Sequence, residues 1–162
     1  MQHPAKTTVK QLRHTIAASL LAALLATIPA ASRAAGSPPP VLPDSYQLSL
    51  LIYTTLAALD QANTTGNYTV LRQLAAPAFQ TLNTPDALAS TFAKYRQKRV
   101  VLTPVMLYQP TLSEPPSIGA DGVLRLKGYF ATRPLRIGFE LGYQPVGGTW
   151  KLISMSILPA QA

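Results

Sequence analysis

The spacing of apolar side chains changes after Arg99, and this change constrains the fold more than any other feature of the sequence. Before Arg99, apolar residues recur every three to four positions, which is the spacing of one face of an α-helix. After Arg99, β-branched and aromatic residues alternate with other residues, which is the pattern of a β-strand. The sequence therefore predicts an α+β domain in which helices come first and an antiparallel sheet follows.

The first predicted helix covers about residues 45–63. Asp44 stands directly before it and Gln47 follows three residues later, which is the spacing of a capping box. Apolar side chains then recur at helical spacing as far as Ala62. The helix is expected to stop at the sequence Thr64-Thr65-Gly66, where turn-forming residues begin.

Two shorter helices are predicted after the first one. The second helix begins at Asn67 and ends at Pro77, because proline lacks the N–H group that a helix interior needs. The third helix has Thr84 as its N-cap and Pro85 at its first helical position, and it extends to Arg96. Three N-terminal helices are therefore expected to pack on the sheet.

Four strands are predicted after the change in spacing, near residues 100–109, 122–130, 135–144 and 149–158. The segment 110–119 is rich in proline, so it is expected to be a long loop or a broken edge strand. The predicted fold is thus three helices packed on a bent four-stranded antiparallel sheet.

Alternation along the strands assigns side chains to the two faces of the sheet. One face carries the charged residues Arg125, Lys127, Arg136 and Glu140. Because opposite charges on neighbouring strands attract, Glu140 is expected to form a cross-strand ion pair on this face.

The last strand is apolar on both faces, which is unusual for a sheet with one face in water. Ile153, Met155 and Ile157 alternate with a second set, which comprises Trp150, Leu152, Ser154 and Ser156. If Lys151 lies on the charged face, the three apolar residues lie on that face too. A row of large apolar side chains is seldom left exposed, so Ile153, Met155 and Ile157 are predicted to form the contact face of a homodimer.

The N-terminal segment resembles a secretory signal peptide over residues 1–34, because cations precede a long apolar run and no acid is present. Small side chains near its end predict cleavage before Ala35 or Arg33, and hence a periplasmic or secreted protein. The alternatives are an uncleaved membrane anchor and an organellar transit peptide, which the unbroken apolar run disfavours. A proline-rich linker over 35–44 then leads to the domain at 45–162.

The chain contains no cysteine, and its only histidines, His3 and His14, lie in the predicted signal peptide. The mature chain therefore has no disulfide, no catalytic triad or Cys-His dyad, and no histidine or thiolate metal site. No cofactor or metal is expected. Without the leader, ten Lys and Arg remain against six Asp and Glu, so the net charge is +4 rather than the +8 of the whole chain.

Three segments of the chain resemble the NTF2-like superfamily, also called the cystatin-like or cone fold. They are residues 66–79, the helical stretch 85–96 and the strand pair within 134–152, and the resemblance covers about 46–158. It is closest to small exported bacterial members without an assigned activity. The resemblance implies a cone-shaped pocket and frequent sheet-to-sheet dimers. It does not imply one activity, because the superfamily contains isomerases, dehydratases, transport factors, secretion-system subunits and binding modules.

Five residues are candidates for lining such a pocket, namely Tyr53, Phe92, Tyr95, Ser154 and Ser156. The two tyrosines have the alternative interpretation of core aromatics with a hydroxyl at the rim. None of the acids is forced inward by the pattern. Asp60 is considered as a pocket acid or as a surface residue, so no catalytic residue is assigned.

The leading hypothesis is an exported, non-catalytic module that binds a small apolar ligand or a protein partner, and that forms a homodimer. The first alternative is an isomerase or dehydratase that uses a pocket carboxylate. The second is a membrane-anchored periplasmic scaffold subunit of a secretion system. The basic run Lys94, Arg96, Lys98 and Arg99 is interpreted as complementing a helix C-terminus, with an acidic membrane surface or anionic glycan as further partners. Nucleic acid is not expected as a partner, because the chain looks exported and lacks a basic and aromatic strand face.

Overall fold

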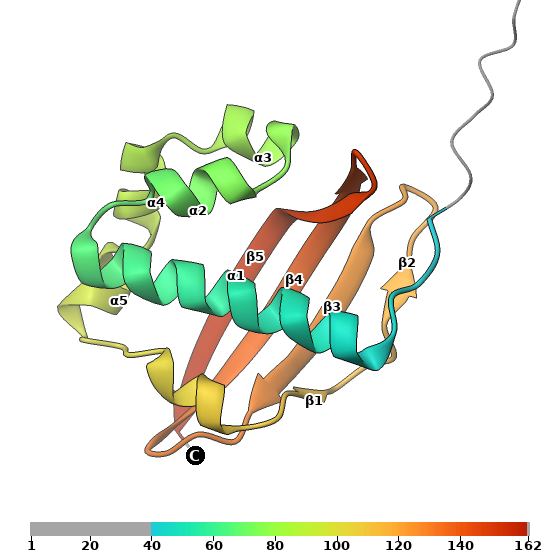
Figure 1. Cartoon of the computed structure of the whole chain (residues 1–162). Coiled ribbons are helices and arrows are strands. Elements are labelled where there is room, and N and C mark those ends of the chain that lie inside the picture. Colours follow the sequence, from blue (N-terminus) through green and yellow to red (C-terminus); the bar gives the residue numbers. More distant parts are fainter. Residues whose placement is uncertain (1–39, 162) are drawn as a thin grey trace, which may run out of the picture. The chain divides into compact units, whose positions relative to one another are not determined.

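A computed structural model describes residues 40–161. The predicted signal peptide at 1–34, the linker residues 35–39 and Ala162 lie outside the described residues. The described part is an α+β domain with several helices and an open antiparallel sheet (Figure 1). The helices precede the main strands of the sheet, as the change in apolar spacing predicts.

Helix α1 (Ser45–Thr65) confirms the predicted first helix at both ends. The Asp44 side chain accepts a hydrogen bond from the backbone N–H of Gln47 at 2.8 Å, and the Gln47 side chain accepts one from the backbone N–H of Asp44 at 3.2 Å. This is the predicted capping box. Gly66 ends the helix with φ = 72°, a left-handed conformation that glycine adopts without a Cβ clash.

The remaining helices are shorter and more numerous than predicted. They are α2 (Thr69–Leu74), α3 (Pro77–Leu82), α4 (Pro85–Thr91) and α5 (Ala93–Gln97). Pro77 ends the second helix as expected, but it also starts α3. Proline is favoured at the first helical position, because the N–H group that it lacks would have no partner within the helix there. The predicted third helix begins correctly, with the Thr84 hydroxyl as N-cap, and is divided into two at Phe92.

The predicted strand over 100–109 is wrong. The chain instead forms a short 3-10 helix, η1 (Thr103–Leu107). Leu102 and Val105 are fully buried and stand three residues apart, which places both on one side of a 3-10 turn. The Asp60 carboxylate fixes the start of this turn, because it accepts hydrogen bonds from the backbone N–H of Leu102 at 2.7 Å and from the Thr103 hydroxyl at 2.5 Å.

The sheet consists of β1 (Thr111–Leu112), β2 (Ser117–Ile118), β3 (Leu124–Phe130), β4 (Leu135–Val146) and β5 (Thr149–Gln161). All pairings are antiparallel, in the order β1-β3-β4-β5, and β2 pairs with the same edge of β3 as β1 does. The segment 110–119 is therefore the broken edge strand of the two alternatives. The three long strands agree with the predicted positions.

A β-bulge in β5 exchanges the faces of its side chains. Gly142 pairs with Ser154 and Tyr143 pairs with Leu152, so Ile153 is an extra residue in β5. Because side chains alternate with a period of two, one extra residue moves every later side chain to the opposite face. The simple alternation used for the last strand therefore fails beyond Leu152.

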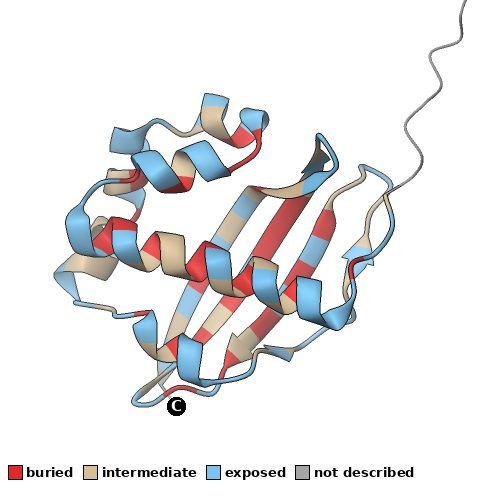
Figure 2. Ribbon diagram, viewed as in Figure 1, coloured by how far each residue is buried: buried red, intermediate tan, exposed pale blue. Residues whose placement is uncertain are grey.

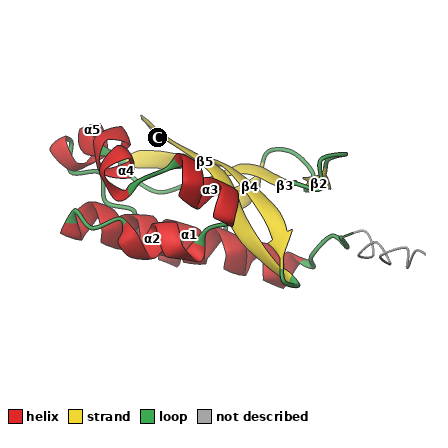
Figure 3. Cartoon of the chain, turned by 90° about the horizontal axis from the view of Figure 1, so that it is seen from above, coloured by secondary structure: helices red, strands yellow, loops and turns green. Residues whose placement is uncertain are grey.

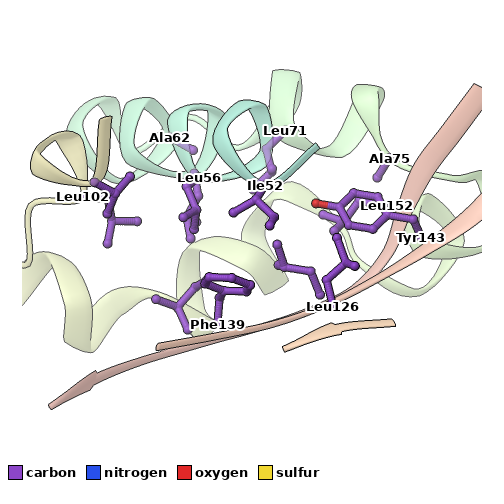
Figure 4. Close-up of a cluster of buried hydrophobic side chains, with 14 of the residues drawn as sticks. Ile52, Leu56, Ala62, Leu71, Ala75, Leu102, Leu126, Phe139, Tyr143 and Leu152 are labelled. Carbon is purple, nitrogen blue, oxygen red and sulfur yellow. The ribbon is translucent and has the colours of Figure 1, made fainter. Parts of the chain in front are cut away.

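The core lies between α1 and one face of the sheet. Buried residues run along the side of α1 that faces the strands (Figure 2). Leu56 and Ile52 from α1 contact the same cluster as Leu126 and Phe139 from the sheet (Figure 4). Seen from above, α1 and α2 lie on one side of the sheet (Figure 3). No described helix covers the charged side.

Two helical elements cover parts of the exposed edge of β5. The backbone N–H of Ala76, just before α3, donates to the carbonyl of Leu152 at 2.8 Å. The Tyr95 hydroxyl, from α5, donates to the carbonyl of Ile157. Because unpaired edge carbonyls attract other strands, these bonds protect a long edge from pairing with another chain.

Candidate functional site

The predicted pocket residues do not lie together. Tyr53 contacts Phe130, with ring centroids 5.7 Å apart, and its hydroxyl donates to the carbonyl of Tyr108 at 2.7 Å. The Tyr95 hydroxyl is used in the same way at the β5 edge. Burial raises the pKa of Tyr95, so this hydroxyl stays protonated and donates. Both tyrosines therefore have the alternative role, that of core aromatics with a hydroxyl at the rim. Each hydroxyl bonds to the backbone of a segment that is distant in sequence.

Phe92 belongs to an aromatic cluster at the helical end of the core. Its ring stacks on Tyr68 with centroids 5.9 Å apart and meets the edge of Tyr95 at 5.5 Å. Phe92 is buried and packs at the break between α4 and α5, and it is not among the lining residues of the three cavities described here. The helical spacing in the sequence shows that Phe92 lies on the apolar side of its helix, but it does not show which residues surround its ring.

Ser154 and Ser156 lie on the opposite face of the sheet from these aromatics. Beyond the bulge they pair with Gly142 and Glu140, and they line a shallow cavity of about 440 Å³ on the charged face. The predicted ion pair of Glu140 is present, because Lys127 Nζ lies 3.2 Å from Glu140 Oε1 and 3.1 Å from Glu114 Oε1. The charged face is thus confirmed, and the serines belong to it.

The placement of Ile153, Met155 and Ile157 on the charged face is wrong. Ile157 pairs with Phe139 and is 2% exposed, and Met155 pairs with the buried Leu141. Both pack against the core, and Ile153 occupies the bulge and is half-buried. The bulge is the physical reason, since it turns the residues after it toward the helices. A homodimer stays a prediction, but these side chains do not supply a contact face for it.

The acids of the chain have structural partners or helix-end positions. Asp44 caps α1, Asp86 lies in the first turn of α4, and Asp60 holds η1. Glu114 and Glu140 share Lys127. Asp60 is half-buried, and its carboxylate caps the start of η1. It is not the acid of a pocket.

The ion pair of Asp121 and Arg125 supports a prediction about pH. Arg125 Nη2 lies 2.5 Å from Asp121 Oδ2, and this contact, with the N–H of Val123, lowers the pKa of Asp121 to about 2. Because the folded pKa lies below the ordinary value of 3.8, the contribution of the pair to stability is present above that value and is lost as the pH falls toward 2. We expect Asp121 to titrate near pH 2 in carboxyl NMR spectra, and Arg125→Gln to return its pKa toward the ordinary value. An ordinary pKa in the unaltered protein would contradict this account.

An apolar groove opens between α1, α2 and the tip of the β4–β5 hairpin. Its volume is about 460 Å³, within the range of small-molecule sites. The lining side chains are mostly apolar: Leu50, Leu51, Thr54, Thr55, Ala58, Leu71, Gln73, Leu74, Ala75, Tyr143, Thr149, Trp150, Lys151 and Leu152. Leu50 from α1 and Leu74 from α2 both line it and remain 49% and 61% exposed. No Asp or Glu lines this groove.

Tyr143 forms a fixed floor for this groove. Its hydroxyl donates to the carbonyl of Leu51 at 2.9 Å and lies 2.8 Å from the Thr55 hydroxyl, which leaves Thr55 as the donor of that pair. Burial raises the pKa of Tyr143 far above its ordinary value, so the phenol is neutral at any physiological pH. The hydroxyl is oriented toward α1 (Figure 4). Its single proton is already donated to the carbonyl of Leu51, so the hydroxyl does not offer this proton to a molecule in the groove.

A backbone hydrogen bond connects two of the segments that line the groove. The bond from Ala76 to Leu152 joins the corner between α2 and α3 to β5, so the two walls are connected directly. Trp150 is half-buried at the hairpin end. The groove is not evident from the sequence, because the helical spacing of α1 indicates a single apolar face. The one indication of the groove in the sequence is Leu50, an apolar residue of α1 that lies outside this apolar face.

Comparisons of the chain with models of protein families, with curated proteins and with solved structures found no match. Among residues 40–161, no helix is both long and apolar enough to cross a membrane. Over the same residues, no three of His, Cys, Asp and Glu gather as metal ligands.

Proposed function

We propose that this chain is an exported, non-catalytic module of the NTF2-like cone fold that binds a small apolar ligand in the groove between α1, α2 and the β4–β5 hairpin. The observation that carries the proposal is the groove itself, with its apolar lining, in which Leu50 and Leu74 remain exposed. Covering such side chains is favourable by about 1.5–3 kcal/mol each when they become fully buried.

Three features support binding rather than catalysis. The groove offers no carboxylate or histidine as a base, its tyrosine is neutral and fixed, and the acids elsewhere cap helices or form ion pairs. The coarse order of helices followed by an antiparallel sheet, with α1 across one face, supports the NTF2-like proposal. The export signal proposed from residues 1–34 supports a ligand that is met outside the cytoplasm.

The single tryptophan of the chain makes the proposal directly testable, because Trp150 lines the groove. Titration with decan-1-ol, a neutral and apolar probe, should shift and saturate the fluorescence of Trp150. Leu74→Gln should weaken the binding of decan-1-ol about tenfold, because it removes one of the apolar side chains that the ligand covers.

Leu82→Gln is the matched control, because Leu82 is 79% exposed on α3 and does not line the groove. It should leave the affinity for decan-1-ol unchanged. Fluorescence that stays constant up to the solubility limit of decan-1-ol would contradict the proposed function. Equal weakening by Leu82→Gln would contradict it too.

A further inference from the structure

A second cavity lies between α5 and the ends of β4 and β5. Its volume is about 560 Å³, and its lining residues are Lys94, Tyr95, Lys98, Val100, Leu135, Pro159 and Ala160. It shares no lining residue with the apolar groove. We refer to its less exposed apolar residues, Val100, Leu135 and Pro159, as its floor and to the exposed Lys94 and Lys98 as its rim. No Asp or Glu lines it.

The cations of this cavity lack carboxylate partners among residues 40–161. The ion pairs of that part of the chain involve Arg125 and Lys127 on the far face of the sheet. Lys94 and Lys98 are four residues apart, at a spacing that brings like charges together along one side of a helix. A helix dipole explains them poorly, because α5 has only five residues.

The residue after Lys98 adds a second observation. Arg99 has φ = 51°, and the next N–H, of Val100, donates to the carbonyl of Tyr95 at 2.9 Å, which closes the end of α5. Glycine is the usual residue at this left-handed position, since other side chains are strained there. The chain nevertheless carries a cation at this position, directly after Lys98 in the sequence.

From this arrangement we infer that the α5 cavity binds one molecule of an anionic amphiphile. The head group, a carboxylate or a phosphate monoester, lies between Lys94 and Lys98, and the start of the alkyl chain covers Val100, Leu135 and Pro159. Tyr95 holds the wall of the cavity through its bond to Ile157. Attraction between unpaired cations and an anion, in a cavity with an apolar floor, selects a charged head that is attached to an apolar chain.

The test compares probes that differ only in the head group. Decanoate and decyl phosphate, each below its micelle concentration, should bind by titration calorimetry. The double variant Lys94→Gln/Lys98→Gln should weaken both by at least about tenfold, which corresponds to ~1.4 kcal/mol. The same variant should leave the response of Trp150 to decan-1-ol unchanged. If decanoate binds tightly and decyl phosphate binds weakly, the head group is a carboxylate. If decyl phosphate binds tightly and decanoate binds weakly, the head group is a phosphate monoester.

Arg99→Gly separates binding from folding, because the two effects have opposite signs. Relief of the left-handed strain should raise the melting temperature, while the loss of a cation beside the rim should weaken binding of decanoate. Unchanged affinity for decanoate in both the double variant and Arg99→Gly would overturn the inference.

Lys151→Gln is the charge-matched control, since Lys151 lines the apolar groove instead. If Lys151→Gln alone weakens decanoate, the amphiphile occupies the apolar groove and the second site is wrong, whereas the proposed function stands. If inorganic phosphate binds as tightly as decyl phosphate, the apolar floor has no role and the inference fails. Binding to vesicles of phosphatidylglycerol without binding of the single amphiphiles would also overturn it.

Discussion

Phe139→Ala should lower the free energy of unfolding by about 3–5 kcal/mol, which is the usual cost of removing a buried phenyl ring. The ring is 1% exposed and lies 5.6 Å from that of Phe130, and its strand neighbours are Gly128 and Ile157. Its removal would leave a cavity between the middle of the sheet and α1, which the close-packed surroundings fill only in part. A loss of this size is a large fraction of the total stability of a small domain.

Urea denaturation followed by circular dichroism measures this loss. Leu82→Ala is a suitable control, because Leu82 is exposed on α3 and should change the free energy of unfolding by less than about 0.5 kcal/mol. A cost below about 1 kcal/mol for Phe139→Ala would show that this ring is not central to the core.

Gly128→Ala should destabilise the sheet by about 1–3 kcal/mol or more, through overpacking rather than through a cavity. A Cβ at this position would overlap the backbone carbonyl of Thr111 and would lie 2.8 Å from Cζ of Phe139. Because Thr111 is paired to β3 through its backbone, relief requires that β1 move away from the sheet. We expect a lower melting temperature and faster amide hydrogen exchange in β1.

Gly142→Ala is the matched comparison for this substitution. The new Cβ would overlap the Ser154 hydroxyl, which is the end of a short side chain and can rotate away. Its effect should therefore be clearly smaller than that of Gly128→Ala. Equal effects would indicate that the cost does not come from the contact with the carbonyl of Thr111, which Gly142 does not approach.

Local signals predicted the parts of the fold that local chemistry decides. The capping box of Asp44 and Gln47, the stop at Gly66 and the start at Thr84 depend on residues close in sequence, and the structure has all three. The alternation along β3 and β4 separates core from charged side chains in the same way. These elements need no distant partner to be recognised.

Elements that depend on distant contacts were not predictable. The segment around Pro104 forms η1 because Asp60, more than forty positions away, accepts bonds from its first residues. The bulge at Ile153 is not marked by a glycine or another turn residue in the sequence of β5. It determines which side chains of β5 beyond Leu152 face the helices. The candidate pocket combined residues from both faces for this reason.

The apolar groove is a further result of tertiary packing. Its walls come from α1, α2 and the β4–β5 hairpin, and the bond from Ala76 to Leu152 brings them together. Within the sequence, Leu50 and Leu74 stand out only as apolar residues beside well-formed core positions. They become a candidate site only because the fold brings both into the lining of one groove.

Methyl NMR spectroscopy of the protein with decan-1-ol tests the proposed binding function most directly. The account predicts intermolecular nuclear Overhauser effects from the probe to the methyl groups of Leu50, Leu51 and Leu74, which line the groove. Leu82 and Leu107, exposed elsewhere on the surface, should show none. Contacts at Leu82 or Leu107 in place of the groove residues would contradict the claim that this groove is the binding site.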